Sequence, residues 1–290
     1  MLKKLFKYDF KSTKRIGIPL LFGVLGLTVI GSIAVLVFVS AFKSMMYMPE
    51  NADETLQITT GLSMVGSMLF IYGVIIGLSL VVAGMQIYCY IDFFRSTVSD
   101  EAYLTFTLPV KAKDLILSKS LCAFLWTVIQ TVAVLISGAI MLSVCAIFAG
   151  EEFGLILEEL QYVGSSLGME AFAVDIALSY ILAIIYVIIN LANTIILVYT
   201  AIFFVSTVMR KHRVIGAIAG VVIANSIIGG ITGIVQLIVG VIAGAIGTLA
   251  QNPYISGNIT TAVMIFVVGG MTVGLFFLLK HLMEKKLNLE

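Results

Sequence analysis

The stretch IGIPLLFGVLGLTVIGSIAVLVFVSAF runs from Ile16 to Phe42 without a single Asp, Glu, Lys or Arg. A helix needs about 20 apolar residues to cross the hydrocarbon core of a bilayer. A charged side chain at the centre of such a helix costs about 3 kcal/mol or more. An uncharged apolar run of this length therefore predicts a membrane-spanning helix.

The composition of the whole chain agrees with this interpretation. Of the 290 residues, 60% are hydrophobic and 11% are charged, whereas about a quarter of the residues in soluble domains are charged. Too few charged side chains remain to cover a water-soluble globule, which excludes a soluble enzyme. We therefore expect an all-α integral membrane protein.

Four further uncharged runs follow the first, and they are Thr55 to Ile91, Ser120 to Gly150, Ile176 to Met209 and Val214 to Leu279. The last run is long enough for at least two crossings, and the turn-forming string from Gln251 to Asn258 divides it. The sequence thus predicts a single transmembrane domain over residues 1–290. Its six transmembrane helices are expected at about 16–42, 62–91, 120–148, 176–208, 214–236 and 259–280.

The distribution of basic residues predicts the orientation. With six spans, every Lys and Arg except Lys43 falls on the side of the two termini. Lysine and arginine gather in cytoplasmic loops, so both termini are predicted to be cytoplasmic, in the plasma membrane. Residues 92–119 then form a cytoplasmic loop, and residues 150–175 form an external acidic loop.

Two segments suggest helical elements besides the spans. Residues 1–15 place apolar side chains on one helical stripe among lysines, which favours an amphipathic helix on the inner membrane surface; an ordinary basic flank is the alternative. Residues 231–250 exceed the length of one span, and a seventh crossing would place the last lysines outside. We expect a re-entrant helical element there before the sixth span, with one long tilted span as the alternative.

The loop at 92–119 contains the string DEAYLTFTLP from Asp100 to Pro109, in which polar and apolar residues alternate. Pro109 interrupts helix geometry. The apolar side chains of Tyr103, Phe106 and Leu108 need to be shielded from water in such a loop. Either they fold back beneath the membrane domain, or they dock a soluble partner as apolar anchors.

Motifs for chemistry are missing from the sequence. It has no GxxxxGK[ST] phosphate loop and no HExxH metal motif, and its three cysteines form no metal-binding pattern. We therefore assign no catalytic, cofactor-binding or metal-binding residues and do not expect an enzyme. The predicted spans also lack the charges typical of ion-coupled carriers. Gln130, Asn190 and Asn193 are candidates to line a substrate path; the alternative for the two asparagines, three residues apart on one helical face, is a hydrogen bond to a neighbouring helix.

The residues from Phe93 to Pro109 and on to Lys119 resemble a loop in permease subunits of export-type ATP-binding-cassette (ABC) transporters of Gram-positive bacteria, the ABC type-2 permease class. Members of that family often read Asp-Glu-Gly-Tyr-Leu-Thr-Phe-Thr-Leu-Pro, and Ala102 replaces the glycine here. The resemblance implies an exporter permease that moves an amphiphilic, peptide-like or drug-like substrate.

The same resemblance implies partners and site residues. The permease would pair with a second copy or a paralogue in membrane lipid, and with separate ABC ATPase subunits that bind ATP and Mg. No nucleic acid is expected. Residues 1–15 would be the elbow helix, and the 92–119 loop would carry a cytoplasmic coupling helix between spans two and three. The implied ATPase-coupling residues are Asp100, Glu101, Tyr103, Leu104, Thr107, Leu108 and Pro109. A non-transporting membrane scaffold or sensor subunit, or a secondary carrier, is the alternative function.

Overall fold

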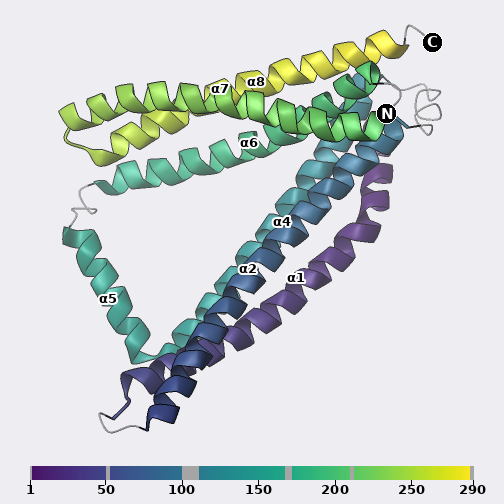
Figure 1. The fold of residues 1–290 in the computed structure, drawn as a ribbon. Coiled ribbons are helices and arrows are strands. Elements are labelled where there is room, and N and C mark those ends of the chain that lie inside the picture. The colour runs from purple at the N-terminus through teal and green to yellow at the C-terminus, as the bar shows by residue number, and fades with distance from the viewer. Residues whose placement is uncertain (1, 50–52, 100–110, 167–171, 210–211, 288–290) are drawn as a thin grey trace. The chain divides into compact units, whose positions relative to one another are not determined.

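The computed structural model describes residues 2–49, 53–99, 111–166, 172–209 and 212–287. These residues form helices and connecting turns, with no strand among them. The helices are α1 (Leu2–Met46), α2 (Glu54–Thr97), α4 (Ala112–Ala149), α5 (Glu151–Ser166), α6 (Ala173–Val208), α7 (Arg213–Leu249) and α8 (Pro253–Leu287) (Figure 1).

Six of these helices, all except α5, are long and apolar enough to cross a membrane. The prediction of an all-α, multi-pass membrane protein is confirmed at this level. With a rise of about 1.5 Å per residue, even α8 is about 50 Å long, more than the roughly 30 Å of hydrocarbon. The helices therefore extend beyond the predicted spans into polar flanks that were expected to be loops.

Helix α1 differs from the prediction of a separate helix at residues 1–15. These residues are helical from Leu2, but they continue into the first span without a break, and Pro19 lies inside the helix. No glycine or proline precedes Gly17, and lysine and leucine are good helix formers. Nothing in the local sequence therefore ends the helix before the span begins.

Helix α7 contradicts the predicted re-entrant element at 231–250. It is one unbroken helix from Arg213 to Leu249, which agrees with the alternative of a single long span. A glycine inside a helix costs only about 1 kcal/mol relative to alanine, and residues 231–249 contain no proline. The glycines there are not sufficient to open a turn.

The break between α7 and α8 falls where turn-forming residues were expected, but it is shorter than the predicted string. Gln251 has a positive φ of 52°. The Asn252 side chain then accepts a hydrogen bond from the backbone N–H of Tyr254 at 2.9 Å, which caps α8, and Pro253 occupies the first helical position. Proline is favoured there because its missing N–H would be unpaired anyway.

The chain divides into two compact units. Unit 1 comprises Met1–Phe10, Tyr88–Phe124 and Gly168–Glu290, and unit 2 comprises Lys11–Ile87 and Leu125–Leu167. In unit 1, α6 packs against both α7 and α8. Asn193 of α6 accepts a hydrogen bond from the Thr272 hydroxyl of α8 at 3.2 Å.

In unit 2, the middle parts of α1, α2 and α4 share an apolar core around Val24, Val74 and Leu78. The Thr28 and Ser137 hydroxyls lie 2.7 Å apart and join α1 to α4. Gly17 of α1 lies against the Trp126 ring of α4. From the first contact to the second, the residue number increases in both helices, from Gly17 to Thr28 in α1 and from Trp126 to Ser137 in α4. The two helices are therefore parallel in this unit.

Candidate functional site

Two helices flank the segment at residues 100–110 that resembles the permease loop. Helix α2 ends at Thr97, and α4 begins at Ala112. The implied coupling residues lie outside the described residues, and they are Asp100, Glu101, Tyr103, Leu104, Thr107, Leu108 and Pro109. The structure describes the helix ends on either side of this segment, which we call its base.

A group of polar side chains from three helices lies at this base in unit 1. Lys119 of α4 forms a salt bridge with Asp92 of α2, with Nζ and Oδ2 2.6 Å apart. The same ammonium lies 3.6 Å from Oδ1 of Asp9 in α1. The Ser118 hydroxyl donates a hydrogen bond to the other Asp9 oxygen. We call these four residues the charged cluster.

Burial makes the charged cluster electrostatically strong. The Lys119 side chain is 7% exposed and that of Asp9 is 13% exposed, so water screens their interaction weakly. The Asp9 and Asp92 carboxylates on either side of the Lys119 ammonium offset the cost of burying its charge. Lys119 therefore stays charged, and the ion pairs hold α1, α2 and α4 together.

Two more contacts in unit 1 join the end of α2 to other helices. Arg213, the first residue of α7, donates a hydrogen bond from Nη1 to the Val98 carbonyl oxygen at 3.0 Å. Carbonyls at a helix C-terminus lack partners within the helix, and a guanidinium is a favourable donor to them. The ring of Phe93 stacks on Tyr199 of α6, with centroids 3.9 Å apart and planes 6° apart. Both rings are fully buried.

These contacts hold together the ends of the helices that flank residues 100–110. The helices on either side of residues 100–110 are fixed to each other, to the start of α1, and to α6 and α7. Among the residues that the structure describes, no group of three His, Cys, Asp or Glu side chains is arranged to hold a metal ion.

The three candidate path residues have different surroundings. Asn193 is buried in unit 1 and bonded to Thr272, which favours a role in helix packing. Asn190 is exposed on the same helix. Gln130 belongs to unit 2 and is completely buried. Asn190 and Asn193 therefore belong to one unit and Gln130 to the other, and a shared substrate path stays a prediction.

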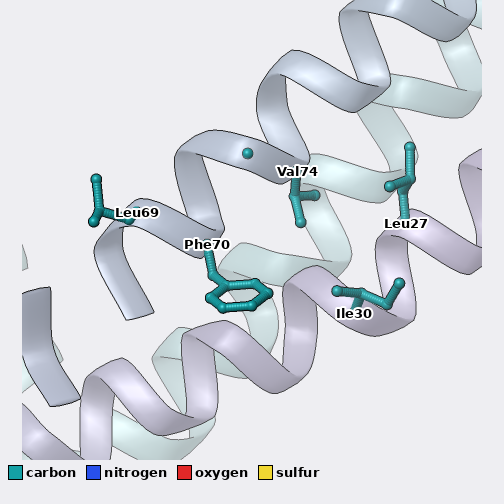
Figure 2. Close-up of a pocket in the computed structure, with 6 residues that line it drawn as sticks. Leu27, Ile30, Leu69, Phe70 and Val74 are labelled. Atoms are coloured by element: carbon teal, nitrogen blue, oxygen red, sulfur yellow. The ribbon is translucent and has the colours of Figure 1, made fainter. Parts of the chain in front are cut away.

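A pocket of about 420 Å³ lies between α1 and α2 of unit 2 (Figure 2). Figure 2 shows Leu27 and Ile30 on the α1 side and Phe70 and Val74 on the α2 side. Gly73 completes the lining with Leu69, and a Cβ added at Gly73 would meet open space. None of the lining residues has a polar side chain, so no side chain of this pocket could orient a ligand by a hydrogen bond.

The other end of unit 1 carries a second polar network, which joins α6 to the start of α8. The Asn252 amide donates to Oδ2 of Asp175 at 2.8 Å. The Asn258 amide donates to the Asp175 backbone carbonyl at 3.1 Å and accepts from the Ser179 hydroxyl at 2.6 Å. This network fixes the α7–α8 turn to α6.

Sequence reasoning missed the acidic members of the charged cluster. Asp9 is the only acidic residue in the lysine-rich segment before Ile16, and Asp92 directly follows an uncharged run. An isolated acid among bases and an acid at the edge of a span were available signals for buried ion pairs. Their partner could not be chosen without knowing which helices are neighbours.

Comparison with protein-family models, curated proteins and solved structures gave no match to this chain.

Proposed function

We propose that this chain is the membrane-spanning permease subunit of an ATP-driven ABC exporter in the plasma membrane, with both termini cytoplasmic. Its cargo would be an amphiphilic, peptide-like or drug-like molecule. ATP and Mg would be bound by a separate ATPase subunit, and this chain would not itself be an enzyme. The resemblance of the segment from Phe93 to Lys119 and the six apolar helices support this proposal.

The observation that carries the proposal is the charged cluster. A coupling segment that is displaced by an ATPase moves the membrane helices only if the helix ends at its base are rigidly connected. Lys119 joins the helices before and after residues 100–110 through Asp92, and it joins both to α1 through Asp9. A buried ion pair of this kind is a costly feature that a simple surface turn does not need. In the proposed permease, this ion pair would keep the flanking helices together while the segment transmits motion.

The connections to α6 and α7 extend the same reasoning. The stacked pair of Phe93 and Tyr199 and the bond from Arg213 to Val98 tie the base of the segment to the rest of unit 1. Displacement of residues 100–110 would therefore move α6 and α7 with α2. Packed elements of this kind shift as bodies because interiors are close-packed.

Asn190 supports the proposed pairing with a second permease copy or a paralogue. Its side chain is exposed near the middle of α6, where lipid offers no hydrogen-bond partner to an amide. A neighbouring permease subunit would supply one. The uncharged runs of the predicted spans suit amphiphilic cargo better than ions.

The test is co-expression of the chain with candidate ABC ATPases, followed by purification in mild detergent and measurement of ATP hydrolysis. Tyr103→Ala and Leu108→Asp should each reduce ATPase association at least several-fold, because each removes an apolar anchor, while the amount of chain in the membrane stays unchanged. Glu158→Ala, on the predicted external face, is the control. Equal association of all variants would refute the proposal and favour a scaffold or sensor subunit.

A further inference from the structure

Gln130 is a buried side chain that the proposed function leaves unexplained. It is completely buried in α4, and neither its Oε1 nor its Nε2 has a hydrogen-bond partner among the described residues. At about 1.5 Å per residue, it lies about 16 Å further along the helix than Lys119. A membrane interior supplies no water at such a depth by default.

The position of Gln130 on α4 shows what it faces. Trp126, one turn earlier, lies against Gly17 of α1, and Ser137, two turns later, bonds Thr28 of α1. Residues separated by four and seven positions share one helical face. Gln130 therefore faces the contact among α1, α2 and α4 within unit 2.

The hydroxyl groups of this contact are already engaged. Thr28 donates to its own helix at the Val24 carbonyl and pairs with Ser137. The Thr131 hydroxyl donates to the carbonyl of Thr127. The side chains that pack near the next turn, such as Ala133 and Val134, are apolar.

The other buried side-chain amides among the described residues are bonded within the protein. Asn193 accepts from Thr272, and Asn258 both donates and accepts. Buried polar groups in native proteins almost always have a partner, from the protein or from a bound molecule. A side-chain amide offers one acceptor and two donors, so its complement is a group that can donate and accept at once.

We propose that Gln130 is the polar contact of a binding site, inside unit 2, for a small neutral group that both donates and accepts a hydrogen bond. Water has this chemistry, and so does the amide of a transported molecule. The site does not depend on any ATPase partner. It gives unit 2 a polar contact in its interior besides the engaged hydroxyls of Thr28 and Ser137.

The test uses the full chain labelled with 15N-glutamine and reconstituted in lipid bilayers. Solid-state NMR measures the transfer of magnetisation from water to the side-chain amide of Gln130, whose signal is assigned by its loss in Gln130→Leu or, if that variant does not accumulate, in Gln130→Met. Asn193, labelled in a separate sample, is the control because it is buried and bonded to protein.

Faster transfer from water to Gln130 than to Asn193 supports the site and identifies water as its occupant. If transfer is equally slow for both, acetamide is added as the simplest neutral amide. A saturable shift of the Gln130 signal then supports the site with a solute amide as its occupant. Slow transfer together with no acetamide shift overturns the proposal.

Discussion

Replacing Lys119 by methionine should destabilise the protein by an amount that its surroundings define. Methionine keeps most of the apolar stem and removes the charge, which leaves Asp9 and Asp92 without their ammonium. Breaking a buried pair costs about 3–5 kcal/mol, whereas an exposed pair is worth about 0–1 kcal/mol. Since the Asp92 side chain is 34% exposed, water offsets part of the loss, and we expect a decrease of about 2–3 kcal/mol.

The assay is the free energy of unfolding, measured by titrating the purified chain in mixed micelles with sodium dodecyl sulfate. Lys113→Met is the matched control, because Lys113 is exposed on the same helix and should cost less than about 0.5 kcal/mol. The double variant Lys119→Met with Asp92→Asn should recover part of the loss, since it removes one of the unpaired carboxylates. Equal costs for the Lys119 and Lys113 variants would refute the reasoning about the charged cluster.

Three further outcomes follow from the packing of the helices. Gly17→Ala should lower the free energy of unfolding by about 1–3 kcal/mol in the same titration, because an added Cβ would lie 2.3 Å from the Trp126 ring. Gly26→Ala is the control and should be neutral or stabilising, because nothing lies within 4 Å of an added Cβ there. Equal effects of the two variants would contradict this packing. Ser137→Ala should cost about 0.5–1.5 kcal/mol through loss of the bond between α1 and α4, and Ser143→Ala, which loses only a bond within its own helix, should cost less. A cysteine at Gly230 should resist membrane-impermeant maleimide added to intact cells, because α7 is one continuous helix. Labelling there would instead support the re-entrant element.

The six apolar helices were predictable because burying a charge in lipid is costly, so membrane-spanning segments stand out in the sequence as long uncharged runs. The break before α8 was predictable for a similar reason, since Asn252 and Pro253 favour the end of one helix and the start of the next. The re-entrant element predicted at 231–250 does not occur in α7, because a length beyond one bilayer thickness does not require a turn. A long helix can tilt or extend beyond the lipid.

The candidate site was only partly predictable. The resemblance pointed to the segment around residues 100–110, but the charged cluster depends on which helices are neighbours. Asp9 and Lys119 meet because the start of α1 lies beside α4 in unit 1, and hydrophobicity carries no information on that pairing. For the same reason, the sequence shows Gln130 as one polar residue in a span, but only the fold shows that its amide is enclosed.

The network between α6 and α8 has a consequence for production of the chain in eukaryotic cells. Asn258-Ile259-Thr260 matches the N-x-[ST] acceptor for N-linked glycosylation. In the folded chain, however, the Asn258 amide is buried and donates to the Asp175 carbonyl. The transferase needs that nitrogen accessible, so folded protein should leave the endoplasmic reticulum without a glycan. A sugar on Asn258 would mark chains that were modified before α8 packed against α6.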